Sequence, residues 1–140
     1  MTMTRHFKAP PEVVWQAYTD PDILPRWYAP EGLSCETKEI DLRPGGVWRF
    51  DMVGNGMRFV NRHRIQSYDP PREIRFLMDD DNDSLPAYAV TVTLTVEGDG
   101  TRLIQTIQFP TSEAYDAAKA MGAEALGQTT LAKLAAIVEA

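Results

Sequence analysis

The chain has 140 residues, of which 44% are hydrophobic and 24% charged, and its formal net charge is −6. These values fit one globular domain over residues 1–140. The acidic balance disfavours binding to nucleic acid or to an anionic membrane, because both require patches of Lys and Arg. No apolar run approaches the ~20 residues of a membrane span, the first residues contain no apolar signal region, and the single cysteine allows no internal disulfide. We therefore expect a cytoplasmic protein.

The first quarter of the chain predicts one strand followed by two short helices. Residues 2–8 have the character of a strand. The Pro10-Pro11 pair ends this strand and can open a helix, because proline is tolerated in a first helical turn. Asp20-Pro21 provides a cap and a first residue for a second short helix, which residues 30–32 should end.

The middle of the chain predicts a series of strands separated by turns rich in glycine and proline. Apolar and polar residues alternate most clearly from Val90 to Val96, where valine and leucine alternate with threonine. Residues 54–56 and 97–100 are typical of hairpin turns. The strands are expected at residues 33–42, 47–53, 57–68, 73–78, 90–96 and 103–109.

The last part of the chain predicts one long helix from about residue 112 to about residue 138, capped by Thr111 or Ser112. At ~1.5 Å per residue it would extend roughly 40 Å. Hairpin-linked strands with helices at both ends indicate an α+β fold with an antiparallel sheet.

Several short motifs occur in an order that is familiar from a known family. They lie at residues 7–10, 12–15, 19–21, 26–32, 41–48, 70–72 and 100–103. Together they resemble the activator-of-Hsp90-ATPase-homologue-like (AHSA1-like) proteins of the START/Bet v 1-like (SRPBCC) superfamily. The resemblance implies a helix-grip fold, in which a curved antiparallel sheet wraps around a long C-terminal helix and encloses a cavity. It leaves the function open, because the superfamily includes lipid carriers, hormone receptors, polyketide cyclases and co-chaperone domains.

The chain departs from this family in the last helix. Many relatives have Gly-Trp where this chain has Leu126-Gly127. Ala123 and Leu131 share the face of Gly127 at helical spacing. A glycine inside a helix costs ~1 kcal/mol relative to alanine. We therefore expect Gly127 either to leave space for a ligand or to let the helix approach the sheet.

Large apolar side chains on one face of the predicted sheet are candidates for a ligand pocket. Opposite the small residues of the helix, they can leave a void, or they can interdigitate with the helix as an ordinary core. The candidates on the sheet are Trp48, Phe50, Met52, Phe59, Ile65, Phe76, Met78, Val92 and Leu94, and those on the helix are Ala123, Gly127 and Leu131.

His63 is the polar residue of most chemical interest, because its strand face also holds Phe59 and Ile65. It can hydrogen-bond a ligand, act as a general acid or base near pH 7, or be a satisfied core histidine. Asn61 and Gln105 present the same alternatives. No recognisable catalytic constellation accompanies them, and Cys35 is expected to be a small buried residue. We expect no cofactor, and two histidines alone cannot form a zinc site.

Two charged groups are expected to face solvent. Arg58, Arg62 and Arg64 share the outer face of one strand. Residues 79–83 are almost all aspartate, but an EF-hand loop starting there would need glycine at position 84 and glutamate at position 90, which are serine and valine. We therefore predict a solvated acidic loop without calcium.

Three functions are compatible with the sequence. The first is binding of a hydrophobic or amphipathic small molecule in the cavity, with Trp27 and Tyr28 at its mouth and Trp15 in packing. The second is a cyclase or isomerase that uses the same cavity with His63 as acid or base. The third, implied by the family name, is contact with a chaperone ATPase in a stress response. Exposed strand edges also allow a homodimer.

Overall fold

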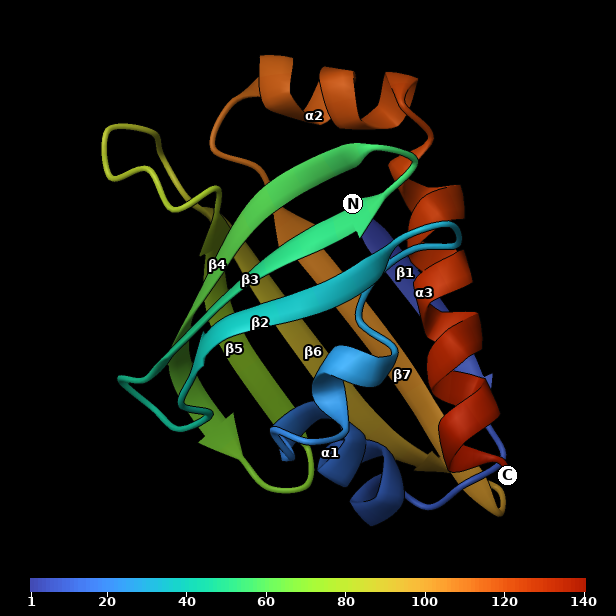
Figure 1. Ribbon diagram of the computed structural model, residues 1–140. Coiled ribbons are helices and arrows are strands. Elements are labelled where there is room, and N and C mark those ends of the chain that lie inside the picture. Colours follow the sequence, from blue (N-terminus) through green and yellow to red (C-terminus); the bar gives the residue numbers. More distant parts are fainter.

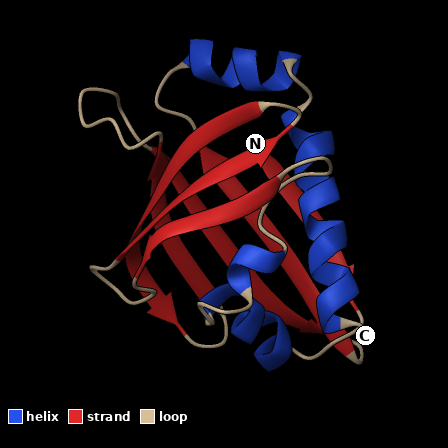
Figure 2. Cartoon of the chain, viewed as in Figure 1, coloured by secondary structure: helices blue, strands red, loops and turns tan.

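One strongly curved antiparallel sheet forms the body of the protein, and the computed structural model describes all of residues 1–140 (Figures 1 and 2). The seven strands lie in the order β1-β7-β6-β5-β4-β3-β2. The strands are β1 (Thr2–Phe7), β2 (Ser34–Ile40), β3 (Val47–Gly54), β4 (Met57–Asp69), β5 (Glu73–Asp79), β6 (Tyr88–Glu97) and β7 (Gly100–Gln108). The helices are α1 (Pro11–Thr19), the 3-10 helix η1 (Leu24–Arg26), α2 (Ser112–Ala120) and α3 (Ala123–Val138). The predicted α+β class and antiparallel sheet are confirmed.

The curvature of the sheet gives it an inner face, along which α3 runs (Figure 1). Helices α1 and η1 close one end, and α2 lies across the other end. Bulges between Thr37 and Glu39 and between Ile65 and Ser67 interrupt the register of the front strands. Because a bulge bends its strand and increases the local twist, both help the sheet to curl around the helix. No helix has the length and apolar character needed to cross a membrane.

Of the two short N-terminal helices that the sequence predicts, the first is confirmed and the second is not. Pro11 begins α1, as predicted, and the helix buries Val14, Ala17 and Tyr18. The second helix is wrong in extent, because only the 3-10 turn η1 forms. The Asp20 carboxylate accepts the N–H of Asp22 at 2.8 Å, which satisfies the backbone in a turn instead of starting an α-helix.

The single C-terminal helix that the sequence predicts is two helices. Thr111 is the N-cap of α2, as expected, and its hydroxyl accepts the N–H of Ala114 at 3.1 Å. The helix then ends because Gly122 adopts a left-handed conformation, with φ +74°. Glycine reaches this conformation without steric cost and commonly ends a helix in this way. As a result α2 buries none of its residues, and only α3 packs against the sheet.

The core forms where α3 and α1 meet the inner face of the sheet. Its largest fully buried side chains include Trp27, Trp48, Phe7 and Phe50. Helix α3 contributes Leu131, Leu134 and Ala135. The alternating pattern of β6 is confirmed for Val90, Val92 and Leu94 but not for Val96, which is 74% exposed at the far end of its strand. Alternation identifies the face of a strand, and it does not reveal how far the covering helix extends.

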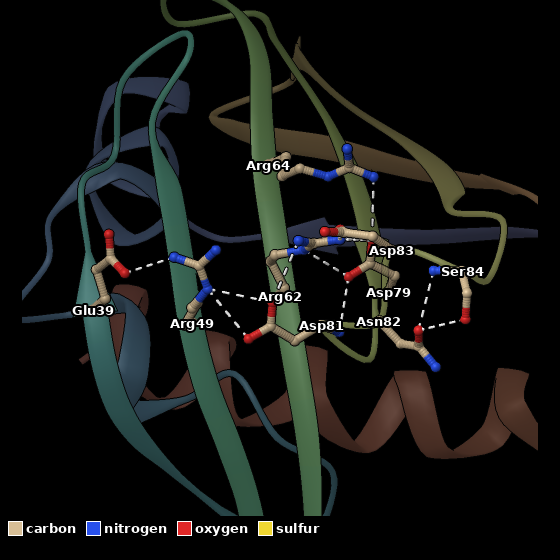
Figure 3. Close-up of polar contacts among 9 residues, drawn as sticks. All are labelled: Glu39, Arg49, Arg62, Arg64, Asp79, Asp81, Asn82, Asp83 and Ser84. Carbon is tan, nitrogen blue, oxygen red and sulfur yellow. Dashed lines mark hydrogen bonds and ion pairs between the residues drawn. The ribbon is translucent and has the colours of Figure 1, made fainter.

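The outer face of the sheet carries an ion-pair network that differs from the expected solvated arginines (Figure 3). Arg62 is only 5% exposed. It faces Asp79 directly across the β4–β5 ladder, and two hydrogen bonds join them, from Nε to Oδ1 at 2.9 Å and from Nη2 to Oδ2 at 2.7 Å. Arg64 contacts the same carboxylate at 3.1 Å. The fork of a guanidinium matches a carboxylate in this bidentate geometry, which is stronger than a neutral hydrogen bond.

The acidic run at residues 79–83 is exposed at Asp80, Asn82 and Asp83, as predicted, but some of its carboxylates also pair with arginines. The Asp81 carboxylate lies 3.2 Å from Nε of Arg49 and 3.3 Å from Nη1 of Arg62, while Asp83 lies 2.8 Å from Nη2 of Arg62. Arg49 also pairs with Glu39 at 2.6 Å (Figure 3). The aspartates therefore neutralise arginines that come from two neighbouring strands. Their run in the sequence hides this role, because the partners lie up to 32 residues away.

Candidate functional site

A cavity of about 220 Å³ lies between α3 and the inner face of the sheet. No Asp, Glu, Lys or Arg lines it. Helices α1 and α3, five strands (β1, β3, β4, β5 and β7) and the segment after η1 all contribute to its wall. The lining residues are Met3, Tyr18, Trp27, Tyr28, Pro30, Met52, Asn61, His63, Met78, Gln105, Ile107, Ala123, Leu126, Gly127, Thr130 and Leu131.

The structure separates the predicted pocket residues into four groups, the last of which is Phe59 alone. Those that line the cavity are Met52, Asn61, His63, Met78, Gln105, Ala123, Gly127 and Leu131. A chamber of about 20 Å³, room for one water molecule, is lined by Trp48, Ile65 and Phe76, together with His63, Tyr18 and Tyr28. Phe50, Val92 and Leu94 are core residues that line neither space.

Phe59 is the predicted pocket residue that lies outside. It is 43% exposed, near the β3–β4 hairpin, where Met57 and Val60 are also exposed. Its strand face follows the expected alternation, but β4 has 13 residues and its first part extends beyond the packed core. The alternation therefore predicted the correct face of the strand for Phe59, but it wrongly placed this residue within the buried part of the strand.

His63 is buried in a group of aromatic rings. Its imidazole stacks on Phe76 at 4.2 Å between ring centroids, and it meets Tyr28, Trp48 and Phe50 edge to face at 5.1 to 5.3 Å. Burial lowers the pKa of His63 to about 3, opposed only in part by the Asp79 carboxylate. The ring is therefore neutral at pH 7. It can hydrogen-bond a ligand, but such a low pKa suits it poorly to acid–base catalysis near neutrality.

Tyr18 is a polar wall residue that the sequence interpretation did not select. Its side chain is 5% exposed, and its hydroxyl is buried without a hydrogen-bond partner. Burial, and then the neighbouring Tyr28, raise the pKa of its phenol, so that the group stays neutral. An unsatisfied buried hydroxyl costs about 1–3 kcal/mol. The helical spacing of Val14, Ala17 and Tyr18 on α1 was the available signal, since it placed Tyr18 on the buried face.

The expectation that Trp27 gates the mouth of the cavity is wrong. Trp27 is 1% exposed, packs edge to face on Tyr18, and donates its indole N–H to the carbonyl of Ala17 at 3.0 Å. These contacts make it a fixed part of the cavity wall. Tyr28 is half-buried, and its backbone carbonyl accepts the thiol of Cys35 at 2.7 Å. Burial raises the pKa of Cys35 to about 12, so this cysteine is a thiol and not a thiolate.

Gly127 lets the thioether of Met3 reach the surface of α3. A Cβ atom at this position would lie 2.2 Å from Sδ and 2.6 Å from Cε of Met3. The sequence allowed Gly127 either to leave space for a ligand or to let the helix approach the sheet. At β1 the helix lies close to the sheet, with Met3 against Gly127. A cavity nevertheless persists on the remaining inner face, with Gly127 in its wall.

A Gly127→Ala variant should be close to neutral alone and stabilising when Met3 is shortened. Alanine favours the helix by about 1 kcal/mol, but its methyl group must displace the end of Met3. In a Met3→Ala background that conflict disappears. Chemical unfolding of the four proteins of this double-mutant cycle should therefore give a coupling energy of at least about 0.5 kcal/mol. Additive effects would contradict the contact.

A second, open groove of about 510 Å³ adjoins the cavity near α2. Asn61 and Met78 line both spaces, so the groove and the cavity adjoin at these two side chains. The other lining residues of the groove come from the first part of β4, the end of β5, the β5–β6 loop, the start of β6 and the start of α2 with the residues before it. They are Val60, Asp79, Asp80, Leu85, Pro86, Tyr88, Pro110, Thr111 and Ala114.

Comparison with known proteins agrees with this architecture. Protein CV1439 of Chromobacterium violaceum has a similar structure, with a TM-score of 0.86 and 29% identity over 100% of this chain and 97% of that one. Protein Ms6760 of Mycobacterium smegmatis has a TM-score of 0.87 and 26% identity, and the match covers 99% of this chain and 89% of that one. The AHSA1 protein of Silicibacter pomeroyi has a TM-score of 0.78 and 26% identity, and the match covers 99% of this chain and 96% of that one.

Sequence comparison leads to the same group. No curated protein matches the chain. A family model described as Activator of Hsp90 ATPase homolog 1-like protein matches residues 8–139. With this match over almost the whole chain, and with helix-grip structures as neighbours, the chain belongs to the AHSA1-like family of SRPBCC proteins.

Proposed function

We propose that this protein binds a small, largely apolar molecule in the cavity between α3 and the sheet. The observation that carries the proposal is the cavity itself, which persists with a lining of mostly apolar side chains and no ionised group. A pocket of apolar walls with a few polar groups is typical of a ligand site.

The energy available from such a site is adequate for specific binding. At ~25 cal/mol per Å², burial of about 200 Å² of apolar ligand surface provides about 5 kcal/mol before association costs. The groove beside α2 offers the route inward, since Asn61 and Met78 are the side chains shared by both spaces. Both side chains are partly exposed.

The test is thermal unfolding of the protein against fatty acids, sterols, flavonoids and polyketide-like aromatics. A ligand at about 100 times its Kd adds ~2.7 kcal/mol, which raises the midpoint by several degrees. An Ala123→Trp variant, which places an indole into the cavity wall, should abolish the shift for any ligand that binds there.

The matched control is Ala125→Trp, on the same helix but at an exposed position. It should keep the ligand-induced shift. A ligand whose effect survives Ala123→Trp binds elsewhere, and the absence of a shift with every class would contradict the proposal.

The other functions that the sequence leaves open have less support. Turnover by a cyclase or isomerase would need an acid or base, and the leading candidate, His63, is held neutral with a pKa of about 3. Contact with a chaperone, a stress response, a homodimer and a cytoplasmic location stay predictions from the sequence and its resemblance. The binding of a small molecule is the function that a feature of the folded chain supports directly.

A further inference from the structure

We infer that the ligand is an uncharged molecule of one or two rings, and that its single hydroxyl or carbonyl group bonds to Tyr18 where the cavity adjoins the small chamber. This inference rests on the proposed function and specifies the chemistry of its ligand. It is carried by the charge, the polar groups and the size of the cavity.

The charge of the wall excludes an ionised ligand from the interior. No Lys or Arg lines the cavity, and the one histidine that does is neutral. The ammonium group of Lys133, on the same helix, is held by the carbonyls of Pro30 at 3.1 Å and Leu33 at 2.9 Å. A carboxylate would therefore be buried without a cationic partner, which is strongly unfavourable.

Tyr18 and His63 are set apart from the other polar residues of the wall (Asn61, Gln105 and Thr130), because they also line a second space. Tyr18 and His63 both belong to the wall of the cavity and to the wall of the adjoining small chamber. The Tyr18 hydroxyl is buried without a partner, although almost all buried polar groups are hydrogen-bonded. A hydroxyl group can donate and accept, so either a ligand hydroxyl or a ligand carbonyl would satisfy it.

The size and the other wall residues favour rings. The volume of about 220 Å³ lies below the range of roughly 300–1,000 Å³ that is typical of sites for drug-sized ligands. Trp27 and Tyr28 supply aromatic faces, and Met52 and Met78 supply polarisable thioethers that pack well against rings.

The experiment uses three probes of one shape: naphthalene, 2-naphthol and 2-naphthoate. Their dissociation constants would be measured by NMR titration of the wild-type protein, Tyr18→Phe and a matched control, Tyr115→Phe, on α2. For the wild type and the control, we expect 2-naphthol to bind about 10-fold more tightly than naphthalene, equivalent to about 1.4 kcal/mol, and 2-naphthoate to bind more weakly than both. In Tyr18→Phe the preference for 2-naphthol should disappear while naphthalene binds as before.

The outcomes separate this inference from the proposed function. If naphthalene and 2-naphthol bind equally to the wild type, the cavity binds apolar molecules and the role of Tyr18 is refuted. If 2-naphthoate binds most tightly, the exclusion of charge is refuted. If the preference for 2-naphthol persists in Tyr18→Phe, another group provides the bond and the inference is refuted. If none of the probes binds, the inference is refuted, and the proposed function is then judged on the wider ligand panel.

Discussion

Replacement of Asp79 by asparagine is expected to destabilise the protein by about 3 kcal/mol, because removal of one partner from a buried ion pair costs about 3–5 kcal/mol. The side chains of Arg62 and Asp79 are only 6% and 3% exposed. Asparagine preserves the shape of the side chain but leaves the guanidinium without its bidentate partner. The neighbouring Asp81 and Asp83 soften the loss, because they also contact Arg62. Unfolding in urea, with the midpoint and slope fitted together, measures the change.

The control is Asp83→Asn, which removes a carboxylate at 2.8 Å from the same guanidinium. The Asp83 side chain is 86% exposed, and solvent-exposed pairs contribute about 0–1 kcal/mol. We expect a loss below about 1 kcal/mol for this variant. Equal losses for the two variants would show that burial of the pair does not determine its contribution.

The second large effect is a loss of stability in mild acid that is caused by His63. The unfolded chain protonates this histidine near its ordinary pKa of 6.5, whereas the folded protein resists protonation down to a pKa of about 3. The unfolded state thus binds more protons in this interval, and acid favours unfolding. The free energy of unfolding should fall by about 1.4 kcal/mol per pH unit below pH 6.5, or about 2–3 kcal/mol by pH 4.5.

A His63→Phe variant tests this assignment, since phenylalanine can stack on Phe76 but cannot be protonated. Its stability should be nearly independent of pH between 6.5 and 4.5 in urea unfolding at a series of pH values. His6→Gln provides the comparison, because His6 is exposed and pairs with Glu97 at 2.8 Å. That variant should retain the slope due to His63. A full slope in His63→Phe would assign the effect to other groups.

Asp79 contributes to the free energy of unfolding over a different pH range. Its pKa lies below the ordinary value of 3.8, because hydrogen bonds from Arg62 and from the Asp81 backbone outweigh the opposing effect of burial. Stability from this group is therefore complete above pH 3.8 and is lost as the pH falls further. Loss of stability between pH 6.5 and 4.5 is due to His63 in this account, and the loss from Asp79 begins only below that range.

The sequence alone predicted the elements whose signals are local. Alternation in β6 from Val90 to Leu94, the hairpin turn at residues 54–56, the start of α1 at Pro11 and the Thr111 cap were all confirmed. Each depends on residues that are close together in the chain, so that propensity and spacing suffice. The resemblance in short motifs extended this to the helix-grip fold. Alternation along the strands also predicted which side chains face inward. For this reason, much of the cavity wall was among the predicted residues.

Only the tertiary structure determined how deeply each side chain is buried, which charged groups pair, and where space remains between the helix and the sheet. Strand alternation could not show that Phe59 and Val96 lie beyond the packed core. It gave no sign that Arg62 would be buried against Asp79 across the ladder. The contact of Gly127 with Met3 depends on how α3 is seated on β1. These properties arise from packing between segments far apart in the sequence, whereas a local pattern reports only which side of an element faces inward.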